Sequence, residues 1–370
     1  MTDRPAADVI EISFFGPGYG EAILIHFGNG DWIAIDSCID PKNGNCVPLE
    51  YLMELEVDLA NQLKLIIATH WHDDHIRGIS SLFRNSTKAK FGLSAAFTKE
   101  EFLQWAAVNA SPDPSPLGKT TIELMAVLQT LKDRGAQPSY VTPDRKLFSS
   151  KIGQSDAEGV LFSLSPSDAV IGRFLEQMAS SLPNAGEPQL RAKDLRPNEV
   201  SVVLSAQFPN GSALLGADLE ETPGKGWSNI LATSTCIGDR ATLFKVPHHG
   251  SENAHCDAVW SKMLSRAVIA IIAPWNRGKR LPTPSDAKRI LSLTQNAYAT
   301  ADPNDISPIK RDPQVRRSLA SMGIDLKLAQ PRSGHLRFRR KIDESQWQIK
   351  MNGTAKHLRS IMSLPYAPSG

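Results

Sequence analysis

Five of the nine histidines of this 370-residue chain fall in two short clusters, residues 70–75 (HWHDDH) and the pair 248–249 (HH). Side chains alternate along an extended segment, so His70 and His72 point to the same side and can bind one metal ion through their imidazoles. Asp74 and His75 lie beyond them, where the chain turns away, and can bind a second ion. The alternative is two core histidines beside a polar helix cap, which is disfavoured because buried His and Asp are costly without partners.

The second cluster can complete such a site. His248 and His249 are adjacent and cannot point the same way, so one is predicted to bind metal and the other to face the substrate. An isolated His-His pair would usually belong to an exposed loop, but here the pair directly follows a predicted buried strand. Asp218 ends another predicted strand, where an isolated Asp would usually belong to a turn. All these ligand atoms are nitrogen or oxygen, which suit zinc and also manganese or iron.

Similar elements precede the two clusters. In the first half, predicted strands over 8–15, 22–27 and 32–36 are followed by a helix after Pro48 and a buried strand over 63–69. In the second half, the predicted strands cover 200–207, 213–217 and 241–246. Asp36 precedes His70 by 34 positions, and Asp218 precedes His248 by 30. This repeat predicts an α/β fold of two sheets packed face to face, with helices outside and both clusters at one edge.

The chain is predicted to form one domain over 1–300 with an insertion at about 80–197, followed by an extension over 301–370. Within 80–197, the pattern predicts a helix over 120–134, a strand over 160–165 and loops over 111–116 and 184–197, which together would cover the site. From residue 301 on there are 13 Lys and Arg residues against 6 Asp and Glu, whereas the first 300 residues carry 28 against 33. The net charge of +2 therefore conceals a basic extension on an acidic body, and the extension is predicted to close the fold or to dock a substrate or partner.

The arginines of the extension suggest nucleic acid as a partner. Arg316-Arg317, Arg332 and the segment 337–341 (RFRRK) could contact phosphates along a groove, because such contacts supply most non-specific affinity for nucleic acid. The alternative is an edge strand with Leu336 and Phe338 inward and the arginines outward.

Composition and the N-terminal residues bear on class and compartment. With 41% hydrophobic and 22% charged residues, the chain has the composition of a globular protein, which excludes a disordered or disulfide-stapled class. The first residues lack the pattern of a secretory signal, and no apolar run reaches the roughly 20 residues of a membrane helix, so a cytoplasmic protein without a membrane partner is predicted. The four widely spaced cysteines are predicted to be reduced thiols.

Residues 70–75 resemble the signature of the metallo-β-lactamase fold, a superfamily of two-metal hydrolases. A second segment, 245–251 (KVPHHGS), together with 198–204 (NEVSVVL) and 216–218 (GAD), resembles the hydrolase domain of the DNA-uptake competence channel ComEC and its soluble relatives, including phosphorylcholine-esterase-like enzymes. The resemblance runs from about residue 10 to 301, and about thirty residues of it are specific. It implies an αβ/βα four-layer sandwich.

The resemblance also implies roles for individual residues. Asp218 would bridge both metals, Asp36 would orient the loop that carries His70, and His249 rather than His248 would be a ligand. Typical members of the superfamily add a histidine ligand from the middle of the chain, and Asn198 stands near that place. Thr283-Pro284 stands where His-Pro is expected. The implied metal ligands are His70, His72, Asp74, His75, Asp218 and His249, and the implied substrate-binding residues are Asn198, Lys245, Ser251 and Thr283.

The expected function is metal-dependent hydrolysis, with Asp74 and His248 as catalytic residues. Two divalent ions about 3.5–4 Å apart would lower the pKa of a shared water toward 7 and neutralise charge on phosphate oxygens. Asp74 would accept a hydrogen bond from the resulting hydroxide, and His248 or a bound water would protonate the leaving oxygen. The expected reaction is hydrolysis of a phosphodiester bond, with nucleic acid as the expected substrate.

Two alternatives stay open because one fold hosts many chemistries. The first is a small-molecule hydrolase that acts on a phosphocholine-like ester, a lactone or a lactam. The second is a partner-controlled effector or binding module, which would dock another protein through 80–197 or through the basic extension.

Overall fold

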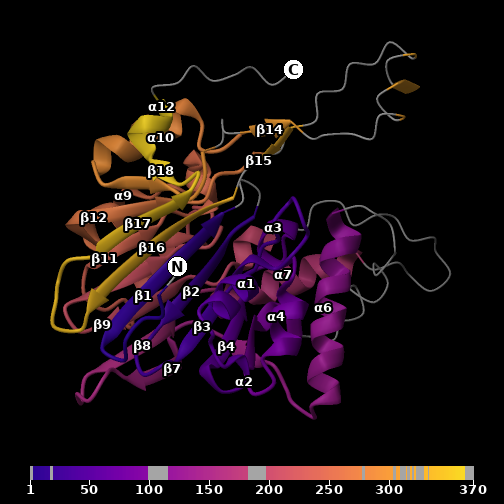
Figure 1. Cartoon of the computed structure of the whole chain (residues 1–370), viewed down its shortest axis with the longest axis horizontal. Helices are drawn as coiled ribbons and strands as arrows, with labels where there is room; N and C mark the ends of the chain where they lie inside the picture. Colours follow the sequence, from indigo (N-terminus) through magenta and orange to yellow (C-terminus); the bar gives the residue numbers. More distant parts are fainter. Residues whose placement is uncertain are drawn as a thin grey trace.

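The computed structural model describes residues 3–16, 20–98, 116–181, 197–276, 280–302, 306–308, 314, 317–318, 321, 329–331 and 333–362. Two eight-stranded mixed sheets form its centre (Figure 1). The strands of the first sheet, in spatial order, are β17 (Gln348–Gly353), β16 (Gly334–Lys341), β1 (Val9–Gly16), β2 (Ala22–His26), β3 (Trp32–Ile35), β4 (Leu63–Ala68), β5 (Lys90–Ser94) and β6 (Ser139–Val141). Those of the second are β18 (Lys356–His357), β13 (Ala297–Ala299), β12 (Leu264–Ile272), β11 (Ala241–Lys245), β10 (Gly211–Leu215), β9 (Leu204–Phe208), β8 (Glu158–Ser163) and β7 (Arg145–Lys151).

The two sheets repeat one pairing pattern. From β1 to β6, two antiparallel pairs are followed by three parallel pairs, and the same sequence of pairs runs from β8 to β13. Parallel strands need crossover segments, and helices supply them. A small separate ribbon joins β14 (Ile306–Pro308) and β15 (Ala329–Pro331). The predicted duplication of one β-rich unit is therefore a property of the whole topology.

Helices cover the outer faces of both sheets (Figure 1). On the first sheet they are α1 (Val47–Glu54), α2 (Leu59–Gln62), α3 (Asp73–Ile76), α4 (Ile79–Asn85), α6 (Pro116–Asp133), α7 (Asp168–Ser181) and the 3₁₀ turn η1 (Ala95–Thr98). On the second sheet they are α8 (Trp227–Thr233), α9 (Asp257–Lys262), α10 (Pro284–Leu293) and α12 (Leu358–Met362). Three further 3₁₀ turns are η2 (Pro197–Val200), η3 (His248–Gly250) and η4 (Glu252–Ala254).

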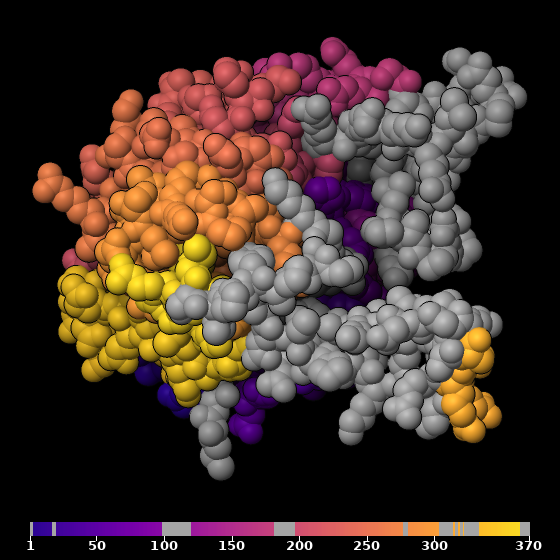
Figure 2. Space-filling model, turned by 90° about the horizontal axis from the view of Figure 1, so that it is seen from above, coloured from indigo at the N-terminus to yellow at the C-terminus, as the bar shows by residue number. Residues whose placement is uncertain are grey.

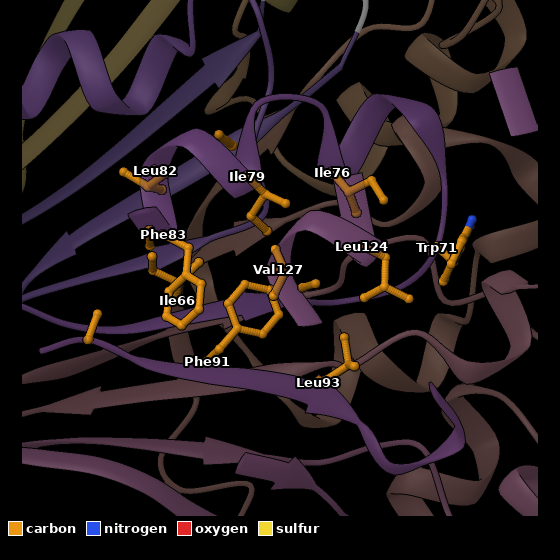
Figure 3. Packing of buried hydrophobic residues seen from close by; sticks show 14 of the residues in the cluster. Ile66, Trp71, Ile76, Ile79, Leu82, Phe83, Phe91, Leu93, Leu124 and Val127 are labelled. Atoms are coloured by element: carbon orange, nitrogen blue, oxygen red, sulfur yellow. The ribbon is translucent and has the colours of Figure 1, made fainter. Parts of the chain in front are cut away.

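Three hydrophobic cores correspond to the three interfaces of this four-layer arrangement. Alternation along β1 sends Ile10, Ile12 and Phe14 into the core between the sheets, while Phe15 joins the core under the first layer of helices. In that outer core, Phe83, Phe91 and Val127 meet over Ile66 (Figure 3). A third core lies between the second sheet and its helices around Trp227.

Residues 80–197, predicted as an insertion, contribute strands to both sheets. β5 and β6 extend the first sheet, and β7 and β8 begin the second. In the repeated pairing pattern, β5 and β6 are the last two strands of the first unit and β8 is the first strand of the second unit. The chain between the two histidine clusters therefore supplies strands to both sheets. The predicted loop 111–116 and most of 184–197 lie outside the described residues.

The basic extension is built into both sheets. β16 pairs antiparallel with β1 along its full length, and β17 pairs with β16 on the other side. β18 pairs with β13, and the C-terminal segment in yellow lies against the orange surface of the second half (Figure 2). β16 is therefore not an edge strand, although Leu336 and Phe338 point into the core as the edge-strand hypothesis expected. Among the described residues, no helix combines the length and the apolar character needed to cross a membrane.

Buried His26 at the end of β2 predicts acid sensitivity of the fold. Its Nδ1–H donates to the Val9 carbonyl at 2.7 Å, its Nε2 accepts from the Gly30 N–H at 3.0 Å, and burial lowers its pKa to about 4. The unfolded chain takes up this proton near pH 6.5, so the contribution of His26 to stability is complete above pH 6.5 and is lost as the pH falls toward 4. Urea titrations should show that going from pH 7.5 to 5.0 costs the wild type about 2 kcal/mol more than His26→Gln. Equal losses in the two proteins would contradict this role.

Candidate metal centre

Each half of the repeat brings two loops to one edge of its sheet. Asp36 directly follows β3 and residues 70–75 follow β4, and β3 and β4 are parallel. Asp218 and the pair 248–249 follow β10 and β11, which are also parallel. Neighbouring parallel strands present their carboxyl ends at the same edge, which is the usual place for a site in α/β sheets. The fold thus gathers side chains that are far apart in the sequence.

The first group of candidate ligands combines both halves of the chain. It consists of Asp74, His75, Asp218 and His249, whose ligand atoms all lie within 4.8 Å of one another. The Nε2 atom of His249 lies 3.1 Å from Asp74 Oδ2 and 3.5 Å from Asp218 Oδ2. The Nε2 atom of His75 lies 3.4 Å from the same Asp218 oxygen.

The second group consists of His70, His72 and Asp218, and it shares the aspartate with the first. Asp218 Oδ2 lies 3.8 Å from His70 Nε2. The two groups therefore meet at one carboxylate oxygen. This is the arrangement expected of a bridging ligand between two cations.

The chemistry and spacing of these atoms fit divalent cations. Ligands of a tetrahedral zinc ion lie about 3.4 Å apart, given metal–nitrogen and metal–oxygen distances of about 2.0–2.2 Å. The distances of 3.1 to 3.8 Å between the ligand atoms are close to this value. His70 Nε2 and His75 Nε2 are buried and have no hydrogen-bond partner among the described residues. A buried polar atom without a partner is costly, and a bound cation would provide the missing interaction.

Neighbouring groups orient three of the histidines. His75 Nδ1 lies 2.7 Å from Asp36 Oδ2, and Asp36 also accepts hydrogen bonds from the backbone N–H and the hydroxyl of Thr69 at 2.7 and 2.6 Å. Thr69 Oγ1 in turn lies 3.1 Å from His70 Nδ1. His249 Nδ1 donates to the carbonyl of Ala273 at 2.8 Å. Binding the Nδ1 side leaves each Nε2 lone pair for a metal, a common arrangement around metal sites.

Four non-glycine residues of the site have positive φ. The values are 58° for Asp36, 45° for Ala217, 47° for His248 and 54° for His249. This left-handed region is unfavourable for residues with a Cβ, and such residues cluster at functional sites when the surrounding structure holds them in place. Here the parallel strands and the two histidine loops hold the backbone in this form.

Burial and charge shift the pKa values of the ligands in opposite directions. Burial holds the pKa of His70 well below its ordinary value and also lowers that of His72, so both are neutral and able to bind a metal. Burial also lowers the pKa of His75, but the negative charges of Asp218 and Asp74 have the larger effect and hold the pKa of His75 well above its ordinary value. Burial would raise the pKa of Asp218, yet His249 and His75 keep it well below the ordinary value. The carboxylates thus create a site that favours positive charge.

His248 is partly exposed and is not among the candidate ligands. Its side chain is 19% exposed, its Nδ1 lies 2.9 Å from Asn253 Oδ1, and its Nε2 lies 3.4 Å from Asn198 Nδ2. Asn198, in η2, also donates to Glu220 Oε1 at 3.1 Å. The structure therefore brings the predicted residues His248 and Asn198 together, with Glu220 and Asn253 as neighbours that the sequence did not indicate.

Lys245 requires a correction. It was predicted to bind substrate, but its side chain is 2% exposed and its ammonium lies 2.5 Å from Glu21 Oε1 inside the molecule. Its position at the last residue of β11, a central strand that lies between β12 and β10 in the second sheet, explains this burial. Burial disfavours the charged ammonium, but Glu21 and Asp218 outweigh it and raise the pKa of Lys245.

Glu21 and Trp275 were missed by sequence analysis. A signal for Glu21 exists in the sequence: a single acidic residue stands between the glycine-rich sequence at 16–20 and the apolar segment 22–25. Trp275 stacks on the His249 ring with centroids 5.5 Å apart and planes at 29°. It is 26 positions from His249 in the sequence, so only the fold reveals the contact.

The other two predicted substrate-binding residues have local structural contacts. The Ser251 N–H donates to the carbonyl of His248 at 2.9 Å and so shapes the histidine loop. Thr283 begins α10, where its hydroxyl accepts from the Asp286 N–H and the Asp286 carboxylate accepts from the Thr283 N–H, a capping box. Substrate contacts of Ser251 and Thr283 stay predictions.

The capping box predicts how Thr283 variants behave. Thr283→Ala should lower the free energy of unfolding by about 1 kcal/mol, because the N–H groups of the first turn lose their acceptor. Thr283→Ser keeps the hydroxyl and should stay within about 0.5 kcal/mol of the wild type. Urea denaturation followed by circular dichroism measures both values. Equal stability of the alanine variant and the wild type would contradict the cap.

The arginines of the basic extension are largely used inside the fold. Arg339 Nε lies 2.6 Å from Glu11 Oε2, and Arg337 lies 3.3 Å from Asp3. Arg340 is 1% exposed and donates to the carbonyls of Glu344 and Pro209. These three side chains therefore do not form a free phosphate-binding row, because acidic side chains and carbonyl groups of the fold already bind them. Arg316 and Arg332 lie outside the described residues.

No protein-family model matches the sequence, and no curated protein matches it either. The structure is similar to several solved structures at low identity. One is a metallo-β-lactamase from Cronobacter sakazakii, with 15% identity, TM-score 0.32, and coverage of 63% of this chain and 75% of that one. Another is a subclass B3 metallo-β-lactamase from a soil metagenome library, with 15% identity, TM-score 0.34, and coverage of 71% and 89%. A third is a metal-dependent hydrolase of the β-lactamase superfamily, with 11% identity, TM-score 0.38, and coverage of 78% and 94%.

The fold class itself follows from the topology. Two mixed sheets related by one repeated pairing pattern, with helices on both outer faces, form an αβ/βα four-layer sandwich, so the predicted α/β fold class is confirmed.

Proposed function

We propose that this protein is a metal-dependent hydrolase with a binuclear centre. The observation that carries the proposal is the position of Asp218, whose Oδ2 atom lies 3.4 to 3.8 Å from the Nε2 atoms of His70, His75 and His249. One buried carboxylate oxygen thus serves two groups of ligands. Exposed acidic groups are common in proteins, but burying a carboxylate among three imidazoles is costly, and bound cations would compensate for that cost.

His70, His72 and Asp218 would hold one cation, and Asp74, His75, His249 and Asp218 the other. When bound, two such cations supply Lewis-acid activation of water and neutralise charge that develops on the substrate oxygens. Zinc and manganese both suit this nitrogen and oxygen ligand set, and iron does as well. Asp36 keeps His75 in place through its Nδ1 atom.

His248 is the proposed proton donor to the leaving group. Its Nδ1 is held by Asn253 Oδ1, which leaves Nε2 beside the Asn198 amide. For this step His248 must carry a proton on both nitrogens; the Nε2 proton can then pass to a leaving oxygen, and the Asn198 amide N–H can donate to a neighbouring substrate oxygen. Asp74 lies deeper, among the candidate ligands, where its carboxylate can accept a hydrogen bond from the attacking water.

The proposed substrate is a phosphodiester of nucleic acid. The segments 198–204, 216–218 and 245–251, which resemble the ComEC-type hydrolase, support this choice. The basic extension supports it less than expected, since Arg337, Arg339 and Arg340 are engaged within the fold. A small ester, lactone or lactam, or a module controlled by a partner protein, are the alternatives that the experiment must separate.

An assay with several substrates tests the proposal. The protein, loaded with Mn²⁺ or Zn²⁺, is incubated with single-stranded, duplex and plasmid DNA, with bis-p-nitrophenyl phosphate and with nitrocefin. We expect cleavage of DNA and of the phosphodiester. Cleavage of nitrocefin alone would contradict a nuclease, and fewer than one bound ion per chain after loading would favour a binding module.

Two variants separate metal binding from proton donation. Asp74→Ala should abolish turnover and reduce the number of bound ions, because it removes a ligand. His248→Ala should lower turnover by about 100-fold or more while the protein still binds its metals, since general acid catalysis contributes about 10²–10⁴-fold. Elemental analysis of both variants provides the comparison, and full activity in both would refute the proposed site.

A further inference from the structure

A buried ion pair joins the two sheets next to the candidate metal centre. Lys245 ends β11 in the second sheet, and Glu21 directly precedes β2 in the first. The ammonium of Lys245 lies 2.5 Å from Glu21 Oε1, and the two side chains are 2% and 4% exposed. Buried ion pairs of this kind gain little stability over an apolar pair, so their presence calls for a reason other than stability.

Both partners contact the backbone of a candidate metal ligand or of its neighbour. The N–H of Glu21 donates to the carbonyl of Asp74 at 2.9 Å. The ammonium of Lys245 donates to the carbonyl of Ala217 at 2.8 Å, directly before Asp218. The pair therefore links the loop that carries Asp74 in the first half to the turn that carries Asp218 in the second.

Lys245 also faces the side chain of Asp218. Its ammonium lies 3.6 Å from Asp218 Oδ1, which accepts no hydrogen bond from the described residues. The other oxygen, Oδ2, faces the imidazoles of His70, His75 and His249. Attraction to the ammonium on one side thus fixes which oxygen of the carboxylate points at the histidines.

The backbone before Glu21 is packed tightly against the same loop. Gly20 has φ of 96°, and a Cβ added there would lie 2.9 Å from the Asp74 carbonyl oxygen and 3.0 Å from Cys38 Cβ. Only glycine fits both the conformation and the space. Glu21 is therefore held at a fixed distance from Asp74, and its carboxylate provides a fixed anchor for Lys245.

We propose that Glu21 and Lys245 are positioning residues that orient Asp218 for binding both cations. The proposal rests on the binuclear function proposed above. Glu21 holds the ammonium, the ammonium holds Asp218 Oδ1, and Asp218 Oδ2 is left to the metals. Without Glu21, the ammonium would pair more closely with Asp218 and compete with the cations for it.

Metal affinity of the apo-protein, rather than activity, tests the proposal. Mn²⁺ titrations followed by electron paramagnetic resonance of the free ion give the dissociation constants. Glu21→Gln should raise them by about 10- to 100-fold, the usual effect of losing a partner of a metal ligand. The double variant Glu21→Gln/Lys245→Met contains no unpaired buried charge, should remain folded by circular dichroism, and should show a similar loss.

A second buried pair provides the matched control. Arg339 and Glu11, with side chains 12% and 0% exposed, lie on β16 and β1 and contact no candidate ligand that the structure describes. Glu11→Gln/Arg339→Met should leave Mn²⁺ affinity unchanged.

The outcomes distinguish the two proposals. If the wild type binds no divalent cation, the proposed function fails. If the wild type binds two ions, and either Glu21→Gln or the folded double variant binds them within threefold of the wild-type affinity, the pair merely supports the fold and this inference is overturned.

Discussion

Replacing Asp218 by asparagine should remove divalent cations from both ligand groups and lower hydrolytic turnover by more than about 100-fold. The side chain is 1% exposed, the residue belongs to both groups, and its Oδ2 atom lies 3.4 to 3.8 Å from histidine nitrogens of both. Changes to outer partners of metal ligands already cost about 10- to 100-fold, so loss of a ligand to two cations should cost more. Elemental analysis of the metal-loaded variant, combined with the phosphodiester assay, measures both effects.

Asp156→Asn is the matched control for this substitution. Asp156 has the same side chain, is 99% exposed and pairs with Lys151 on the surface, so its replacement should change neither metal content nor turnover. A folded Asp218→Asn variant that keeps two ions and more than a tenth of the activity would show that Asp218 is not the bridge.

Lys245→Met should be among the most destabilising single substitutions in the protein. It leaves the Glu21 carboxylate buried without its ammonium partner, and breaking one side of a buried pair costs about 3–5 kcal/mol. The effect should appear in the metal-free protein, because it arises from the ion pair itself. Urea denaturation of the apo-protein measures the change in the free energy of unfolding.

A double-mutant cycle distinguishes loss of the pair from poor packing of methionine. Adding Glu21→Gln to Lys245→Met removes the uncompensated charge, so the double variant should regain most of the lost stability. A double variant as unstable as Lys245→Met would mean that methionine does not fit the site and that the charge is not the cause.

The local chemistry of the site was readable in the sequence. Residues 70–75 and 248–249 each follow a strand, and the alternation of side chains places His70 and His72 together without any knowledge of the fold. Asp36 and Asp218 could be identified because they end equivalent strands of a repeated unit. These signals depend on residues that are close in the sequence or regularly spaced, so they can be recognised without the tertiary structure.

Other parts of the prediction failed because strand pairing is a long-range property. The pairing of β5 and β6 with the first sheet, and of β7 and β8 with the second, depends on contacts between residues distant in sequence. Long-range pairing also decides the place of the arginines on β16, which the sequence left open between contacts with phosphates and an edge strand. Their alternation with apolar residues is also compatible with an edge strand, and only the neighbours β1 and β17 decide between the two.

The sequence alone determined the fold class, the nitrogen and oxygen character of the site and the residues that form its two groups, because strand alternation and repeated strand ends are written in the order of residues. Only the tertiary structure decided that Lys245 is buried against Glu21, that His248 is partly exposed beside Asn198, and that one oxygen of Asp218 faces three imidazoles. These facts depend on how the two sheets face each other. The carboxyl ends of strands from both halves meet there, and the burial that results makes each charge require a partner.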